Sequence, residues 1–96
     1  VIVYRKHNYY IYAAKDGYIV HNSKKEFSKG HTHINNYHTA KYLIDMSYYS
    51  KIPYHTYDYI LESLIRISTD KNYIDSLRKL KKGRKKEIKN MECLNY

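Results

Sequence analysis

In the stretch AAKDGYIVH, residues 13–21, an Asp-Gly pair separates two β-rich segments. Asp16-Gly17 is a favoured pair for a two-residue type I′ turn, since both turn positions need a positive φ. Residues 9–14 and 18–22 flank the pair and contain Tyr, Ile and Val, which favour strands. The sequence therefore predicts an antiparallel hairpin that closes at Asp16-Gly17.

A turn at Asp16-Gly17 also predicts which residues face each other across the hairpin. The expected cross-strand pairs are Lys15 with Tyr18, Ala13 with Val20, and Ile11 with Asn22. Alternation along each strand then gathers four side chains on one face: Ile11, Ala13, Tyr18 and Val20. Residues 1–5 can add a third strand through a turn at His7-Asn8.

Beyond residue 36 the apolar residues take up the spacing of helices. The first stripe contains Tyr37, Ala40, Leu43, Ile44 and Tyr48, and the second contains Tyr57, Ile60, Leu61, Leu64, Ile65 and Ser68. The third contains Tyr73, Ile74, Leu77 and Leu80. Asn35 or Asn36 is expected to cap the first helix, and Pro53 to separate it from the second, which should have about four turns. Residues 68–70 should end the second helix and cap the third, with Gly83 as the C′ residue of the third.

These segments predict an α+β domain, with an N-terminal antiparallel β-hairpin or three-stranded meander, about three α-helices and a basic C-terminal tail. The expected boundaries are a single domain over residues 1–83 and a basic extension over residues 84–96. Strands and helices do not alternate, and no Gly-rich phosphate loop is present. The common nucleotide-binding folds are therefore not expected, and no cofactor is predicted.

Positive charge is concentrated near the C-terminus. The formal net charge is +9, and residues 78–96 hold eight basic and two acidic residues. The basic ones are Arg78, Lys79, Lys81, Lys82, Arg84, Lys85, Lys86 and Lys89. Such a block is stabilised by a polyanion, for which DNA or RNA is the commonest candidate. The alternative is a solvated helix end whose charges complement the helix dipole.

Three of the six histidines lie in GHTHINNYH, residues 30–38. In an extended segment His31 and His33 would project to the same side, but two ligands do not make a zinc site, and His21, His38 or Asp45 would have to complete one. We therefore expect no metal and interpret the segment as a polar loop that leads into a helix. With Lys24, Lys25 and Lys29 it would offer donors to phosphates.

One cysteine, Cys93, excludes an intramolecular disulfide, and no run of apolar residues approaches the length of a membrane span. A cytoplasmic protein without a membrane partner is expected. Lys, Asn, Ile and Tyr, all with AT-rich codons, make up 46 of the 96 residues, of which 14 are Tyr. Exposed tyrosines are natural contact residues, although codon bias alone would also supply them.

A small, basic, Tyr-rich chain of this kind resembles the accessory proteins of phages and mobile elements of low-GC Gram-positive bacteria, anti-CRISPR inhibitors among them. The resemblance is one of type and carries no family motif. We predict a non-enzymatic binding protein that acts on nucleic acid or a nucleoprotein complex, as a host-defence inhibitor. The alternatives are a small DNA-binding transcriptional regulator and a ribonuclease toxin that uses histidines as acid and base.

Overall fold

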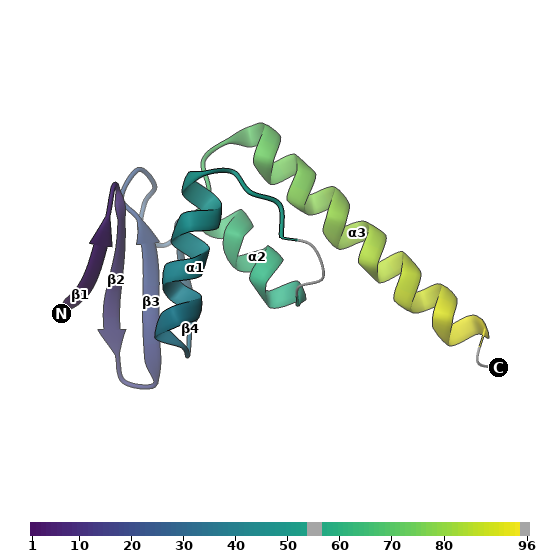
Figure 1. Cartoon of the computed structure of the whole chain (residues 1–96), viewed down its shortest axis with the longest axis horizontal. Helices are drawn as coiled ribbons and strands as arrows, with labels where there is room; N and C mark the ends of the chain where they lie inside the picture. The colour runs from purple at the N-terminus through teal and green to yellow at the C-terminus, as the bar shows by residue number, and fades with distance from the viewer. Residues whose placement is uncertain (54–56, 95–96) are drawn as a thin grey trace.

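The structure, a computed structural model, describes the backbone of residues 1–53 and 57–94 and the side chains of residues 1–53 and 57–83. Four strands precede three helices (Figure 1). The strands are β1 (Ile2–Lys6), β2 (Tyr9–Ala14), β3 (Gly17–Asn22) and β4 (His31–Ile34), and the helices are α1 (Tyr37–Tyr48), α2 (Asp58–Ile67) and α3 (Lys71–Leu94). The predicted α+β class is confirmed, and the sheet has one strand more than predicted.

The sheet is an antiparallel meander in the order β1-β2-β3-β4. The hairpin and the third strand are confirmed, and Lys6 pairs with Tyr9 across the His7-Asn8 turn. Residues 31–34 form β4, so their interpretation as a loop is wrong. Backbone pairing with β3 makes this short segment a strand, and its partners are ten or more residues away in the sequence.

The predicted register of the hairpin is wrong by two residues. Ala14 pairs with Gly17 and Ala13 with Tyr18, so the two-residue loop is Lys15-Asp16. Gly17 is instead the first residue of β3, with a φ of 148°, and a Cβ atom there would lie 2.8 Å from the Ile34 carbonyl oxygen. The close contact with β4 therefore requires a glycine at position 17. Because the shift is an even number of residues, every side chain stays on its predicted face.

Helices α1 and α2 pack against one face of the sheet (Figure 1). That face supplies the buried Tyr9, Ile11, Val20 and Ile34 to the core, and the helices supply Ala40, Leu43, Ile44, Ile60, Leu61, Leu64 and Ile67. Buried polar bonds join the layers, since Tyr9 bonds Ser47 in α1 and Thr32 bonds Ser63 in α2. The covered face of the sheet is thus fixed by both packing and hydrogen bonds.

The helix stripes are confirmed except at Tyr48 and Tyr57. Tyr48 and Tyr57 are 42% and 70% exposed, whereas Ser47 and Ile67 are buried. Helix α2 has ten residues, about three turns instead of four. It ends at Ile67 because Ser68 is extended and its hydroxyl bonds Ser47 in the core.

Two of the predicted helix starts are confirmed by their caps. The Asn36 side chain accepts a hydrogen bond from the Thr39 backbone N–H, and the Asp70 carboxylate accepts bonds from the first turn of α3. Gly83 does not end α3, which continues to Leu94. A Cβ atom at Gly83 would meet nothing within 4 Å, so no close contact forces a turn there. The predicted boundary at residue 83 stays a prediction.

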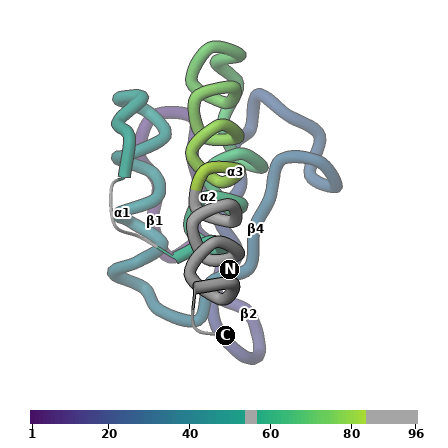
Figure 2. Tube along the Cα trace, turned by 90° about the vertical axis from the view of Figure 1, so that its right-hand side faces the viewer, coloured from purple at the N-terminus to yellow at the C-terminus, as the bar shows by residue number. Residues whose placement is uncertain are grey.

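Helix α3 packs against α2 on the side away from the sheet. In Figure 2, which views the molecule from the right-hand side of Figure 1, α3 lies in front of α2. Tyr73 and Leu77 anchor its first half in the core. The sheet and α3 are therefore the two outer layers, with α1 and α2 between them.

Candidate functional site

The sheet face opposite α1 and α2 is here called the open face, because the helices pack on the other side. Strand pairing brings its side chains into two rows that cross the sheet. The first row is Arg5, Tyr10, His21 and His31, and the second row is Ile2, Tyr12, Ile19 and His33. The first row therefore holds only aromatic and basic side chains, and the second alternates aliphatic with aromatic ones, on a surface that no described helix covers.

The loop between β3 and β4 adds a further ring to this surface. Phe27 stacks on His31, with ring centroids 4.4 Å apart and an angle of 3° between the planes. The Phe27 ring also contacts His21, at 5.2 Å and 63°, and His31 contacts His33 at 5.1 Å and 77°. Because Phe27 is 49% exposed, one side of this cluster faces solvent.

Backbone contacts hold the loop in this shape. The Gly30 N–H donates to the Glu26 carbonyl, and a Cβ atom at Gly30 would lie 2.5 Å from Cβ of Lys25. Only glycine therefore fits where the loop enters β4. His21 Nε2 donates to the Lys25 carbonyl at 3.0 Å, and His31 Nδ1 donates to the Phe27 carbonyl. One nitrogen of each imidazole thus orients its ring, and the other remains for a ligand.

The β1 and β2 side of the open face continues the aromatic surface. The Tyr10 and Tyr12 rings lie 6.3 Å apart and are close to parallel. The Arg5 guanidinium carbon is 5.6 Å from the Tyr10 ring centroid, within the range of a cation–π contact. Rings and a fixed positive charge therefore lie side by side, which is the combination that binds bases and phosphates of single strands.

No protein-family model, curated protein or solved structure matches this chain.

The predicted site residues of the β3–β4 segment divide between the open face, the adjoining loop and the end of α2. His31 and His33 share this face, and Lys24 and Lys29 are exposed in the adjoining loop. Lys25 instead donates to the Arg66 and Ser68 carbonyls, at 2.8 and 3.2 Å. Burial, followed by the positive charge of Arg66, lowers the pKa of Lys25. Lys25 therefore ties the loop to the end of α2.

The predicted basic residues of α3 lie in a separate part of the molecule. Arg78, Lys81 and Lys82 line a groove of about 310 Å³ with Glu62 and Ile65 of α2, where Lys81 pairs with Glu62. Lys79 is exposed on the same helix. The side chains of Arg84, Lys85, Lys86 and Lys89 lie outside the described residues. Since α1 and α2 lie between α3 and the sheet, Arg78, Lys79, Lys81 and Lys82 belong to a different layer from the open face (Figure 1).

The histidines and carboxylates do not gather into a recognisable metal site in the part of the chain that the structure describes. There, no group of three or more His, Cys, Asp or Glu side chains is arranged to hold an ion.

Among the described residues, no helix combines the length and the apolar character needed to cross a bilayer.

Sequence reasoning missed Arg5, Tyr10, Tyr12 and Phe27 as candidate site residues. The alternation of Thr32 and Ile34 with His31 and His33 was a signal for a fourth strand, since Thr32 and Ile34 are buried. Once β4 is placed beside β3, the pairing places His21 opposite His31. The sequence does not show which face of the sheet the helices cover, so it could not identify the open face as a surface that can bind a partner.

Proposed function

We propose that this chain is a non-enzymatic protein that binds single-stranded nucleic acid on the open face, either free or as part of a nucleoprotein complex. The observation that carries the proposal is the first row, in which Arg5, Tyr10, His21 and His31 cross four neighbouring strands. Each ring in such a row offers a face or an edge to a base, and stacking is worth about 1–3 kcal/mol per base.

Charge supports a nucleic acid as the occupant of this aromatic surface. The chain carries a formal charge of +9, and Arg5, Lys24 and Lys29 are exposed at or beside the first row. A polyanion that lays its bases on the rings can therefore reach cations with its phosphates. An apolar protein partner would leave these charges without counterions.

A single strand fits the open face better than a duplex does. In a duplex the faces of the bases are covered by their neighbours, so they cannot stack on Tyr10 or Phe27. In RNA-recognition modules, four-stranded sheets bind the unstacked bases of single strands on their aromatic side chains. The proposal therefore commits to single-stranded RNA or DNA at this face.

The two facing histidines suit both binding and acid–base catalysis, and we put binding first because Tyr10 and Arg5 in the same row supply stacking and charge that cleavage does not need. His21 and His31 each use one ring nitrogen to donate to a loop carbonyl, which orients the imidazole. Acid–base cleavage of RNA would need a second group within hydrogen-bond reach of the reacting atoms. We therefore place ribonuclease activity second, and the assay below includes it.

The biological form that we propose is an inhibitor from a phage or mobile element, of the anti-CRISPR type, acting in the cytoplasm. It rests on the likeness of composition to such accessory proteins. An inhibitor of this kind would cover exposed RNA or displaced single-stranded DNA of a nucleoprotein complex. The open face supplies the chemistry for such contact, and α3 offers a second basic surface for the same complex.

The test is a set of binding titrations with short fluorescent single-stranded RNA, single-stranded DNA and duplex DNA of matched sequence. We expect the single strands to bind more tightly than the duplex and to stay intact. Tighter binding of the duplex would contradict the proposal and favour a DNA-binding regulator that uses α3. Cleavage of the RNA that is lost in His31→Ala would establish the ribonuclease alternative instead.

A further inference from the structure

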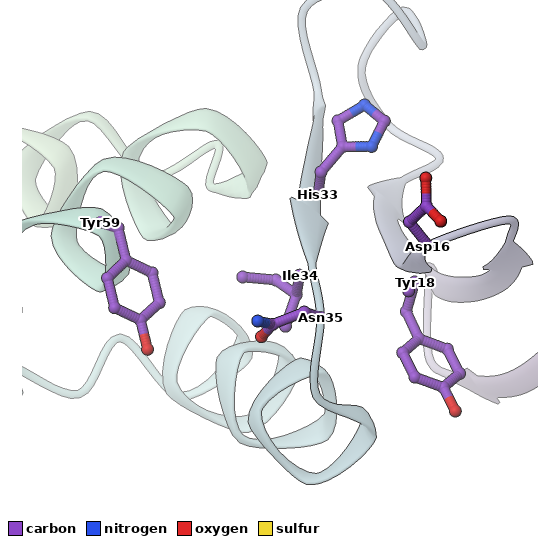
Figure 3. A pocket seen from close by; sticks show the side chains of 7 residues that line it. Asp16, Tyr18, His33, Ile34, Asn35 and Tyr59 are labelled. Atoms are coloured by element: carbon purple, nitrogen blue, oxygen red, sulfur yellow. The ribbon is translucent and has the colours of Figure 1, made fainter.

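A pocket of about 470 Å³ opens at the end of the sheet where β2 turns into β3 (Figure 3). Its lining consists of Asp16, Gly17, Tyr18, His33, Ile34, Asn35 and Tyr59. His33 belongs also to the second row, whereas Tyr18 and Ile34 lie on the covered face, so the pocket reaches from the open face around the end of β4 toward α2. The volume lies within the range of pockets that hold small ligands, and a single nucleobase fits it.

Close packing of the β2–β3 turn against β4 forms the pocket. A Cβ atom at Gly17 would lie 2.8 Å from the Ile34 carbonyl oxygen and 3.0 Å from the Asn35 Cα atom. Glycine therefore lets the turn approach the end of β4, and Asp16 comes to the pocket with it. Asn36 then caps α1 and turns the chain away. Tyr59 of α2 forms the wall on the other side of β4 (Figure 3).

The pocket is lined by polar groups that are free to meet a ligand. Among the described residues, the Asp16 carboxylate and the Asn35 carboxamide have no hydrogen-bonding partner. Figure 3 shows the Asp16 carboxylate and the His33 ring on the same side of β4. An aromatic face and an acceptor of two hydrogen bonds therefore lie next to each other.

The negative charge of Asp16 restricts what part of a nucleic acid can lie there. A carboxylate repels a phosphate, whereas it accepts hydrogen bonds from the N–H groups of a base. Arg5, Lys24 and Lys29 lie toward the opposite end of the open face, near the β1–β2 turn and the β3–β4 loop. Phosphates are thus favoured at that end of the face and a base edge at the Asp16 end.

We propose that this pocket takes one guanine base of the bound strand, stacked on His33 and donating to Asp16. Guanine carries two adjacent donors on its Watson–Crick edge, N1–H and the exocyclic amino group, which match the two oxygens of a carboxylate. Adenine, cytosine and uracil lack this adjacent pair of donors. The inference rests on the proposed function, since it names the base that the strand presents at one end of the open face.

The first test compares binding of an oligouridine strand with that of the same strand carrying one guanine. We expect the guanine-containing strand to bind about tenfold more tightly, the discrimination typical of one bidentate base contact. Asp16→Asn should abolish this ratio. Glu26→Gln, which removes the same charge from the exposed loop at the other end of the face, should preserve it. A ratio near one in the native chain, or a ratio unchanged in Asp16→Asn, would overturn the proposal.

A second measurement separates failure of the pocket from failure of the proposed function. Free guanosine, adenosine, cytidine and uridine are titrated while the backbone amide resonances of the full chain are followed. We expect guanosine alone to shift the resonances of Asp16, His33 and Asn35. If strands bind without base preference and guanosine shifts nothing, the pocket inference fails while the proposed function stands. If guanosine binds there but no strand binds, the proposed function fails while the guanine pocket stands.

Discussion

His21 and His31 lie directly opposite each other on β3 and β4, and Phe27 from the loop between these strands contacts both rings. The two histidines are ten positions apart in the sequence, yet their imidazole rings lie on the same side of the sheet. Each ring also donates a hydrogen bond to a carbonyl of the same loop. The loop and the two histidines thus form one unit, which closes one edge of the open face.

This unit predicts that the histidines of β4 contribute to binding and not to turnover. Replacing both His31 and His33 with Ala should weaken single-strand binding by about 1 to 2 kcal/mol, through lost stacking and donor groups. Fluorescence anisotropy titration measures the loss. His38→Ala is the matched control, because His38 is exposed on α1. If His38→Ala lost as much affinity as the double variant, β4 would not be part of the binding surface.

Tyr10 lies in the first row between Arg5 and His21, and its ring should carry stacking energy. Tyr10→Ala should weaken binding of a single strand about tenfold, the lower part of the range for one lost base stack. Tyr10→Phe keeps the ring and should restore most of the affinity. Tyr42→Ala, an exposed tyrosine of α1, should have no effect. If Tyr10→Phe binds as poorly as Tyr10→Ala, the hydroxyl and not the ring would be responsible.

The β-rich half of the fold could be predicted because its signals are local. An Asp-Gly pair between two strand-forming segments identifies a hairpin without further context. The register was predicted wrongly because Gly17 is fixed by its approach to Ile34, which lies in a strand that was interpreted as a loop. Strand β4 has only four residues, and its pairing with β3 is what defines it.

The candidate site was harder to predict than the fold. Histidine and lysine in residues 24–33 indicated a binding segment, but Lys25 differs from Lys24 and Lys29 only in its contacts with the end of α2. Tyr10 and Tyr12 could not be separated from the other tyrosines by composition. Their role depends on which face the helices cover, and that follows from packing between distant segments.

Two lysines of the β3–β4 loop should have different roles: Lys25 should contribute to stability and Lys29 to binding. Lys25→Ala loses two hydrogen bonds to α2 carbonyls, so we expect the free energy of unfolding to fall by about 1 kcal/mol. Lys29→Ala should leave stability unchanged and reduce the salt dependence of binding by about 0.7 in log–log slope, the value for one phosphate contact of a single strand. Urea unfolding and titrations at several salt concentrations measure these effects. If Lys29→Ala lowered the stability and Lys25→Ala lowered only the salt dependence of binding, the placement of Lys25 against the end of α2 would be contradicted.

Buried tyrosines predict loss of stability in alkali. Burial raises the pKa of Tyr73, and the nearby Tyr9 and Tyr42 raise it further. A raised pKa in the folded state means that the stabilisation is complete below about pH 10, the ordinary pKa of tyrosine, and is lost as the pH rises through the folded-state pKa. The free energy of unfolding should therefore decline above about pH 10.

Tyr73→Phe tests this cause of the alkaline decline. The variant loses the hydrogen bond from the Tyr73 hydroxyl to the Lys51 carbonyl, which should cost about 1 kcal/mol at neutral pH. Its stability should then fall less steeply in alkali than that of the native chain. Tyr57→Phe, at a position 70% exposed, is the control. Equal slopes in the native chain and Tyr73→Phe would show that other groups cause the decline.

We expect the open face, and not α3, to hold a single strand of nucleic acid. The most direct test follows the backbone amide resonances of the full chain during titration with a short single-stranded RNA. We expect the largest shifts in the two rows and the β3–β4 loop, at Arg5, Tyr10, His21, Phe27 and His31, with small shifts in α3. Shifts confined to residues 78–94, with those five residues unmoved, would contradict the account.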